Sequence, residues 1–154
     1  MIKDSGDVIV KTLARLLAPF IVAYALYVVM HGHHSPGGGF QGGVILAAGF
    51  VLLAISHGLE MMQRKLSERT AEVLSSAGVL IYAGIGFLCI FLGGNFLDYG
   101  SLYKIFGVPR AQARSLGILG VELGVALAVM AVMCTIFLAI YKAGEVDRRD
   151  GGRQ

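Results

Sequence analysis

The stretch HGHHSPGGGFQGG, residues 31–43, holds the densest group of chemically distinctive residues in this sequence. Its three histidines titrate near neutral pH, so they could relay protons or bind a metal ion. A zinc site usually needs three or four ligands at suitable spacing, and no Cys, Asp or Glu stands close to these histidines. We therefore predict no metal site. We keep His33 as a candidate for proton entry, beside the alternative that it belongs to a solvated structural loop.

The glycines of this stretch suggest a phosphate-binding loop, but the pattern GxxxxGK[ST] is absent and no strand precedes them. A backbone break explains them better. The residue before Pro36 is biased toward an extended conformation, and the three glycines at 37–39 then permit a tight re-entry of the chain. We expect Phe40 to pack where the next helix begins, and Gly42 and Gly43 to keep its first turns slim.

Glu122 is the other candidate, because it is the one acidic residue inside the long apolar runs that we identify below. Burying an ionisable group in a membrane costs at least about 2.5 kcal/mol, so such a group normally faces protein or water. We expect Glu122 to contribute to an ion path or to an ion pair with another subunit. The alternative is that it lies near a helix end and reaches headgroups or a basic neighbour.

The elements that carry these residues are membrane spans. The sequence is 56% hydrophobic and 15% charged, whereas a soluble domain is about 25% charged. A spanning helix needs about 20 mostly apolar residues. Four runs qualify, so we predict an all-α integral membrane protein with one domain over residues 1–154. The predicted spans are 12–30, 42–59, 73–92 and 116–141, followed by a polar tail at 142–154.

These spans leave no room for a separate soluble catalytic domain, so the sequence argues against an enzyme acting on its own. It indicates no catalytic residue and no cofactor. Ten Lys and Arg residues lie at the two ends and in the middle connector, against three in the other two loops. This distribution predicts that both termini are cytoplasmic. The net charge of +3 reflects the same bias and gives no reason to propose nucleic-acid binding.

The predicted fourth span also has a face of small residues. At about 100° per residue, Gly117, Gly120 and Gly124 fall on one stripe, while Glu122 lies close to the opposite face. Small residues at this spacing let another helix approach closely. We therefore expect the stripe to pack on a neighbouring helix. Since the carboxyl opposite it needs a partner too, we expect that burying both faces takes a foreign subunit.

The motif and the four-span plan together resemble a known family. The segment HGHHSPGGGFQGGVILA is similar to the GHxxPGGGFxGG segment of the B-type subunits of Mrp-type multisubunit Na⁺/H⁺ antiporters, the MnhB family. The fourth span, with GVELGVALAV, also looks like that family, and the resemblance extends from about Val8 to Tyr141. Carried over by position, the matching residues are Gly32, His33, Pro36, Gly37, Gly38, Gly39, Phe40, Gly42 and Gly43.

The resemblance implies a small non-catalytic subunit of a complex that exchanges Na⁺ for H⁺ across the cytoplasmic membrane. Its partners would be other membrane subunits and the surrounding lipids. Similar subunits occur in ferredoxin-driven membrane-bound hydrogenases, which remain an alternative at this point. Two further alternatives stay open. The chain could be a purely structural subunit that braces the complex, or an independent small-molecule exporter that works as a small oligomer.

Overall fold

The computed structural model describes the backbone of residues 2–32 and 38–151, and most side chains between residues 8 and 144. His33, Pro36 and Gly37 lie outside the described residues. Within the described part the chain is helical, without strands, and four of its helices are long and apolar enough to cross a membrane. The predicted all-α membrane fold is therefore confirmed. The helices are α1 (Ile2–Met30), α2 (Gly38–His57), α3 (Leu59–Lys65), α4 (Glu68–Phe91), η1 (Tyr99–Leu102), α5 (Tyr103–Phe106) and α6 (Arg110–Gly151).

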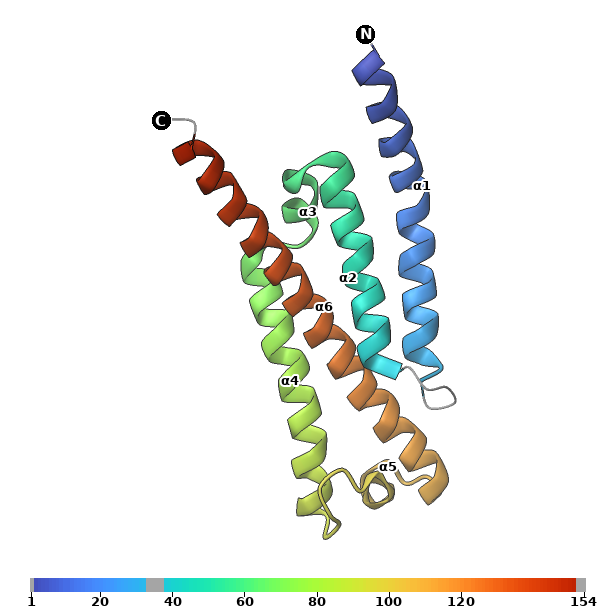
Figure 1. Cartoon of the computed structure of the whole chain (residues 1–154). Coiled ribbons are helices and arrows are strands. Elements are labelled where there is room, and N and C mark those ends of the chain that lie inside the picture. Colours follow the sequence, from blue (N-terminus) through green and yellow to red (C-terminus); the bar gives the residue numbers. More distant parts are fainter. Residues whose placement is uncertain (1, 33–37, 152–154) are drawn as a thin grey trace.

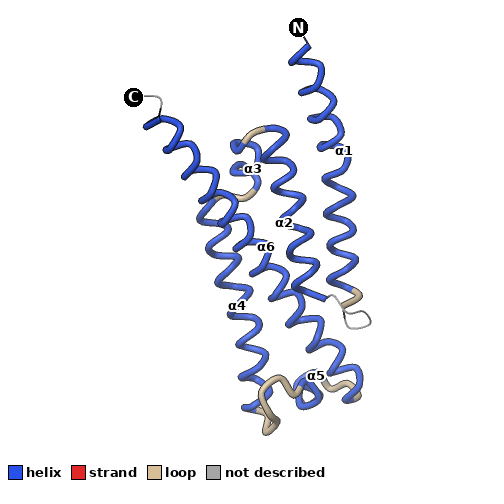
Figure 2. Tube along the Cα trace, in the orientation of Figure 1, coloured by secondary structure: helices blue, strands red, loops and turns tan. Residues whose placement is uncertain are grey.

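The four long helices lie side by side in the order α1, α2, α6, α4 (Figure 1). Helices α1 and α4 run away from the end that holds the two termini, and α2 and α6 run back toward it. The short helix α3 lies at the terminal end, whereas η1 and α5 lie at the opposite end. Only short connections separate the helices, as Figure 2 shows. Helices α2 and α6 therefore occupy the middle of the bundle.

Several helices extend beyond the expected spans. Helix α4 begins at Glu68 because the side chain of Ser67 accepts a hydrogen bond from the Thr70 amide and caps it. Helix α6 follows Pro109, a residue suited to a helix start, and continues through most of the expected polar tail to Gly151. Hydropathy detects only the apolar part of a helix. The polar turns at the end of such a helix have the same backbone hydrogen bonds, but a search for apolar runs does not detect them.

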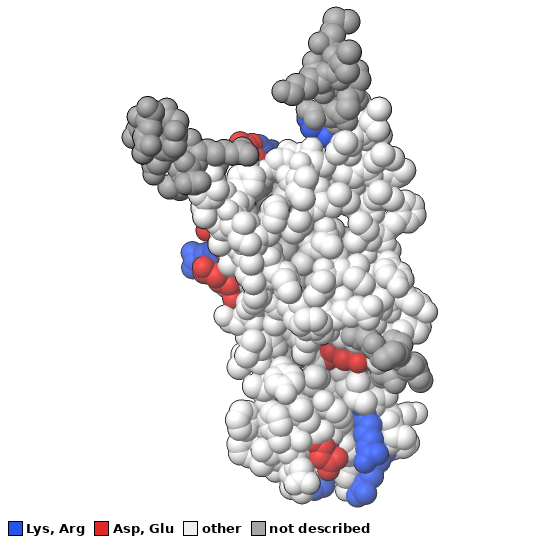
Figure 3. All heavy atoms as spheres, viewed as in Figure 1, with Lys and Arg blue, Asp and Glu red and all other residues white. Residues whose placement is uncertain are grey.

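The main core consists largely of small side chains that allow close helix packing. It includes Ala25 of α1, Ala47 of α2 and Ala131 of α6. Met62 of α3 and Leu66, directly after α3, also belong to it. The two edge helices, α1 and α4, expose apolar side chains on their outward faces. Phe20 of α1 is 66% exposed and Leu80 of α4 is 73% exposed. Figure 3 shows a broad uncharged surface between the charged groups. An exposed apolar surface of this extent fits contact with lipid.

Candidate functional site

The carboxyl group of Glu122 lies against the two sides of the glycine-rich break. A Cβ atom added to Gly38 would stand 2.7 Å from Oε1 of Glu122, and one added to Gly32 would overlap both carboxylate oxygens. Oε2 of Glu122 is shielded from solvent. A side chain at position 38 would therefore displace this carboxylate, and one at position 32 would also overlap the backbone of Gly38. The structure brings together two features that lie about 80 residues apart in the sequence.

Helix α2 also touches the backbone of α6 directly at its start. Gly38 has φ +43°, in the left-handed region that favours glycine. A Cβ atom on Gly39 would overlap the backbone carbonyl of Glu122. The first residues of α2 therefore lie directly against the backbone of α6.

The next glycines of α2 face its two neighbours in turn. A Cβ atom on Gly42 would meet Val29 of α1, and one on Gly43 would stand 2.7 Å from the carbonyl oxygen of Ala126 in α6. The expected slim opening of α2 therefore serves both contacts. Phe40 differs from expectation, because its side chain is 61% exposed. Its ring is free to contact lipid or another subunit, because α1 and α6 take up the glycine faces of α2.

The small-residue stripe of α6 faces the other way, toward α4 and η1. A Cβ atom on Gly117 would stand 2.8 Å from Tyr99 and from Leu102. A Cβ atom on Gly120 would stand 2.9 Å from Ile85, and one on Gly124 would stand 2.9 Å from the carbonyl oxygen of a glycine in α4.

This arrangement corrects the expectation that a foreign subunit is needed to bury both faces of α6. Helix α4 covers the glycine stripe, and α2 of the same chain covers the face that carries Glu122. The approach of α2 could not be read from the sequence, because it depends on Gly39 and Gly43 lying directly against the backbone of α6 at Glu122 and Ala126. Local periodicity does not show which helices become neighbours.

The site lies near one edge of the apolar layer. Helix α2 has 20 residues and, at 1.5 Å per residue, measures about 30 Å, the thickness of a bilayer's hydrocarbon core. Its first residue, Gly38, contacts Glu122. Along α6, Glu122 follows Gly117 by about 7.5 Å, and Gly117 contacts η1 at the end of the bundle. Glu122 therefore lies toward the end of the bundle opposite the described ends of the chain.

Sequence reasoning misses Tyr99, because this residue lies in the expected polar connection at 93–115. Its ring packs on Gly117, and burial raises the pKa of its phenol, with Tyr82, Cys89 and Glu122 adding to the shift. The signal that could have found it is the pair of tyrosines in a polar segment next to two spans, since tyrosine is enriched at membrane interfaces. Tyr99 thus packs on the glycine stripe of α6, the face away from the contact of Glu122 with α2.

Of the predicted site residues, the structure gathers Gly32, Gly38, Gly39 and Glu122 in one place. Glycines 42 and 43 follow one turn later on α2, while glycines 117, 120 and 124 lie on the other face of α6. Within the described residues, no three His, Cys, Asp or Glu side chains gather as a metal site. The arrangement is a carboxylate held against the buried backbone at the start of α2.

Comparison with known proteins gives a consistent result. The family model described as "Domain related to MnhB subunit of Na+/H+ antiporter" matches residues 9–135, a segment that contains both the break and Glu122. The putative antiporter subunit mnhB2 of Staphylococcus haemolyticus is 28% identical over 135 residues, covering 88% of this chain and 94% of that protein. The B-type Na(+)/H(+) antiporter subunit of Alkalihalophilus pseudofirmus is 28% identical over 137 residues, covering 88% and 93% respectively.

Proposed function

The chain belongs to the MnhB family of Na⁺/H⁺ antiporter subunits, and on this premise we propose that it works as the B-type membrane subunit of a multisubunit Na⁺/H⁺ antiporter. Relatives with antiporter names cover nearly the whole chain, which favours an antiporter over a hydrogenase-type complex. Its role is that of a transporter subunit, and its partners are the other membrane subunits of the complex. Na⁺ and H⁺ are the transported ions.

In its working orientation, both termini and α3 face the cytoplasm, and the glycine-rich break faces the outer side. Two observations support this placement. The two described ends of the chain lie at the same end of the bundle. Most Lys and Arg residues of the sequence belong to the segments at that end, as the positive-inside rule requires.

Within the complex, Glu122 supplies a carboxylate to the path of a cation or a proton at its outer end. The observation that carries this proposal is the contact of the carboxylate with the backbone at Gly32 and Gly38. Hard cations are bound by oxygen ligands, which carboxylates and backbone carbonyls supply. An ionisable group near the apolar layer is retained where it pairs with protein groups or serves an ion pathway.

A second candidate role is a static brace, in which Glu122 only locks the α1–α2 turn to α6. The close contact of Gly39 and Gly43 with the α6 backbone favours this reading, because such contacts fix the two helices in one register. The two roles differ in what fails when the charge is lost. A brace fails in assembly, whereas an ion site fails in turnover.

The test replaces Glu122 in the complete antiporter and measures Na⁺-dependent proton movement in vesicles, normalised to assembled complex. Glu122→Gln keeps the shape but fixes the group neutral, so exchange should fall at least about tenfold. Glu122→Asp keeps the charge on a shorter stem and should retain part of the activity. Glu60→Gln, the same chemical change at an exposed site in α3, is the matched control.

Loss of assembled complex with Glu122→Gln, but normal exchange by what remains, would assign Glu122 to the brace. Wild-type exchange at wild-type assembly would remove Glu122 from both roles. The family assignment would stand in each case, because it rests on the match over residues 9–135.

A further inference from the structure

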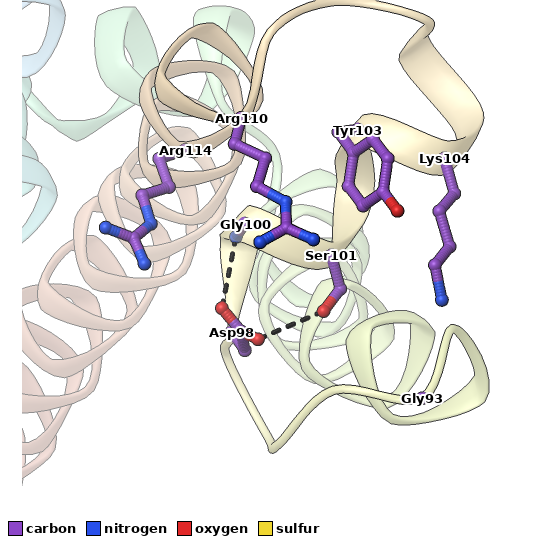
Figure 4. Close-up of a pocket in the computed structure, with 8 residues that line it drawn as sticks. All are labelled: Gly93, Asp98, Gly100, Ser101, Tyr103, Lys104, Arg110 and Arg114. Carbon is purple, nitrogen blue, oxygen red and sulfur yellow. Dashed lines mark hydrogen bonds between the residues drawn. The ribbon is translucent and has the colours of Figure 1, made fainter.

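A second site lies at the end of the bundle opposite the termini. There η1, α5 and the first turns of α6 enclose a cavity of about 280 Å³ (Figure 4). Its volume is slightly below the usual 300–1,000 Å³ range of pockets for drug-sized ligands, so it suits a small polar group. Neither Glu122 nor the glycine-rich break lines it. The side chains that do are Asp98, Ser101, Tyr103, Lys104, Arg110 and Arg114.

The cavity carries an excess of positive charge. Three cationic side chains line it against the single carboxylate of Asp98. That carboxylate is already engaged locally: Oδ1 accepts from the Gly100 amide at 3.2 Å, and Oδ2 accepts from the Ser101 hydroxyl at 3.0 Å. Within the described part of the chain, none of the three cations forms an ion pair. The ion pair found there joins Lys142 and Glu68. The cavity can therefore accept at least one more negative charge.

Two of the three cations, Lys104 and Arg110, are held in place by other contacts. Lys104 donates from Nζ to the carbonyl oxygen of Leu92, and the Arg110 guanidinium lies 4.9 Å from the centre of the Tyr103 ring. Arg110 is also the first residue of α6, where the helix dipole favours an anion. Figure 4 shows the two arginines extending from α6 on the side of Asp98, whereas Lys104 extends from α5 toward the segment at Gly93. Prearranged guanidinium groups of this kind match the oxygen geometry of a phosphate.

The surroundings of the cavity indicate where the phosphate comes from. The connector that forms it also exposes large apolar side chains: Phe96 is 46% exposed, Ile105 53% and Phe106 48%. It follows directly from α4, which ends at Phe91 at the edge of the apolar layer. A free phosphate ion gains nothing from apolar surface, whereas the acyl chains of a lipid do.

We propose that the cavity between η1, α5 and the start of α6 binds the phosphate of an anionic phospholipid headgroup, with Lys104, Arg110 and Arg114 as its ligands. The acyl chains lie along the exposed apolar side chains of the same connector. This lipid site does not depend on ion exchange at Glu122.

The test uses the full-length chain purified in detergent together with the subunits that co-purify with it. After delipidation, native mass spectrometry measures binding of dioleoylphosphatidylglycerol and of the zwitterionic dioleoylphosphatidylcholine. Wild type should prefer phosphatidylglycerol, and the double change Arg110→Gln and Arg114→Gln should weaken its binding about tenfold or more. Lys65→Gln, an exposed cation in α3 at the other end of the bundle, should leave binding unchanged.

Both arginines are exposed, so the double variant should stay folded. Circular dichroism checks this, and Lys104→Gln serves as an independent variant with the same expected direction. Equal phosphatidylglycerol binding by wild type and by these variants would overturn the proposal. Displacement of the lipid by millimolar inorganic phosphate would overturn the lipid as occupant and assign the cavity to a free anion.

Discussion

Gly38 combines two constraints that can be separated by experiment. Its φ of +43° is strained for residues with a side chain, and its missing Cβ leaves room for the Glu122 carboxylate. Gly38→Ala should therefore cost about 1 kcal/mol in backbone strain and should also displace the carboxylate. We expect a clear loss of Na⁺/H⁺ exchange, measured in vesicles at equal amounts of assembled complex.

Two other glycines serve as controls for this change. Gly58 has φ +89° but no atom within 4 Å of an added Cβ, so Gly58→Ala introduces the strain without the clash. Gly84 has neither feature, so Gly84→Ala should be silent. If Gly58→Ala reduced exchange as much as Gly38→Ala, backbone strain alone would explain the loss and the contact with Glu122 would be irrelevant.

At this scale the sequence singles out Glu122 and the glycine-rich break separately, but it does not predict that they lie in contact. Glu122 was recognisable because a carboxyl in an apolar run is costly, and the break because proline and three glycines interrupt two such runs. Their contact depends on how far α2 is displaced along α6. That displacement follows from the matching of Gly39 and Gly43 with α6, which no local pattern contains.

Among the elements, α4 and α6 show how closely two spans can approach. A Cβ atom on Gly124 would stand 2.9 Å from the carbonyl oxygen of Gly78. Gly124→Leu should therefore force the helices apart, at a cost of about 1–3 kcal/mol or more. Since α4 belongs to the same chain, we expect the defect as a lower unfolding temperature of the chain in detergent, before any effect on subunit assembly.

Gly84→Leu provides the comparison on the same pair of helices. Gly84 lies on α4 where an added Cβ meets nothing within 4 Å, so this change should leave the unfolding temperature unaltered. A Gly124→Leu chain as stable as wild type, but unable to assemble, would mean that its glycine stripe packs on another subunit after all.

Helix α3 was hidden in what the sequence presents as a charged connector. Met62 of α3 and the residue after the helix, Leu66, are nearly inaccessible and belong to the main core, whereas Arg64 and Lys65 are exposed. Seven residues are too few for a clear helical periodicity, so the apolar positions did not stand out from their charged neighbours. The burial of α3 arises because the ends of the spans near the termini leave room that its side chains fill.

We therefore predict that Met62→Ala is strongly destabilising. Removing a buried methionine side chain costs about 2–5 kcal/mol, and Met62 is 0% exposed. The unfolding temperature of the chain in detergent should fall accordingly. Lys65→Ala, an exposed change in the same short helix, should have little effect. Similar values for both variants would show that α3 is not part of the core.

For the whole molecule, the orientation in the membrane can be tested with introduced cysteines. Gln112 is exposed near the start of α6, and Glu60 is exposed in α3 at the opposite end of the bundle. In intact cells, Gln112→Cys should react with an impermeant thiol reagent added outside, and Glu60→Cys should react only after lysis. The native Cys89 and Cys134 are buried and should give little background. The reverse labelling pattern would invert the proposed orientation.

The overall architecture followed from the sequence more readily than its details. Four apolar runs are enough to predict four spans, and an even number of spans returns the chain to the side on which it began. The order of the helices across the bundle was not predictable, because the hydrophobic effect does not drive apolar helix faces together in lipid, so apolarity alone does not show which helices pack on each other. Close glycine contacts decide that order, and they appear only when the helices are placed together.

The shallow position of Glu122 also determines how strongly the membrane voltage acts on it. Moving one elementary charge through the whole potential is worth about 2.3 kcal/mol per 100 mV. If the edge of a layer of about 30 Å is taken at Gly117, which contacts η1, Glu122 lies about 7.5 Å inside it. A cation that binds there then crosses about a quarter of the field. Its occupancy should follow the pH and salt concentration of the nearer compartment. Most of the electrical work is then done when the ion moves from this carboxylate across the rest of the membrane.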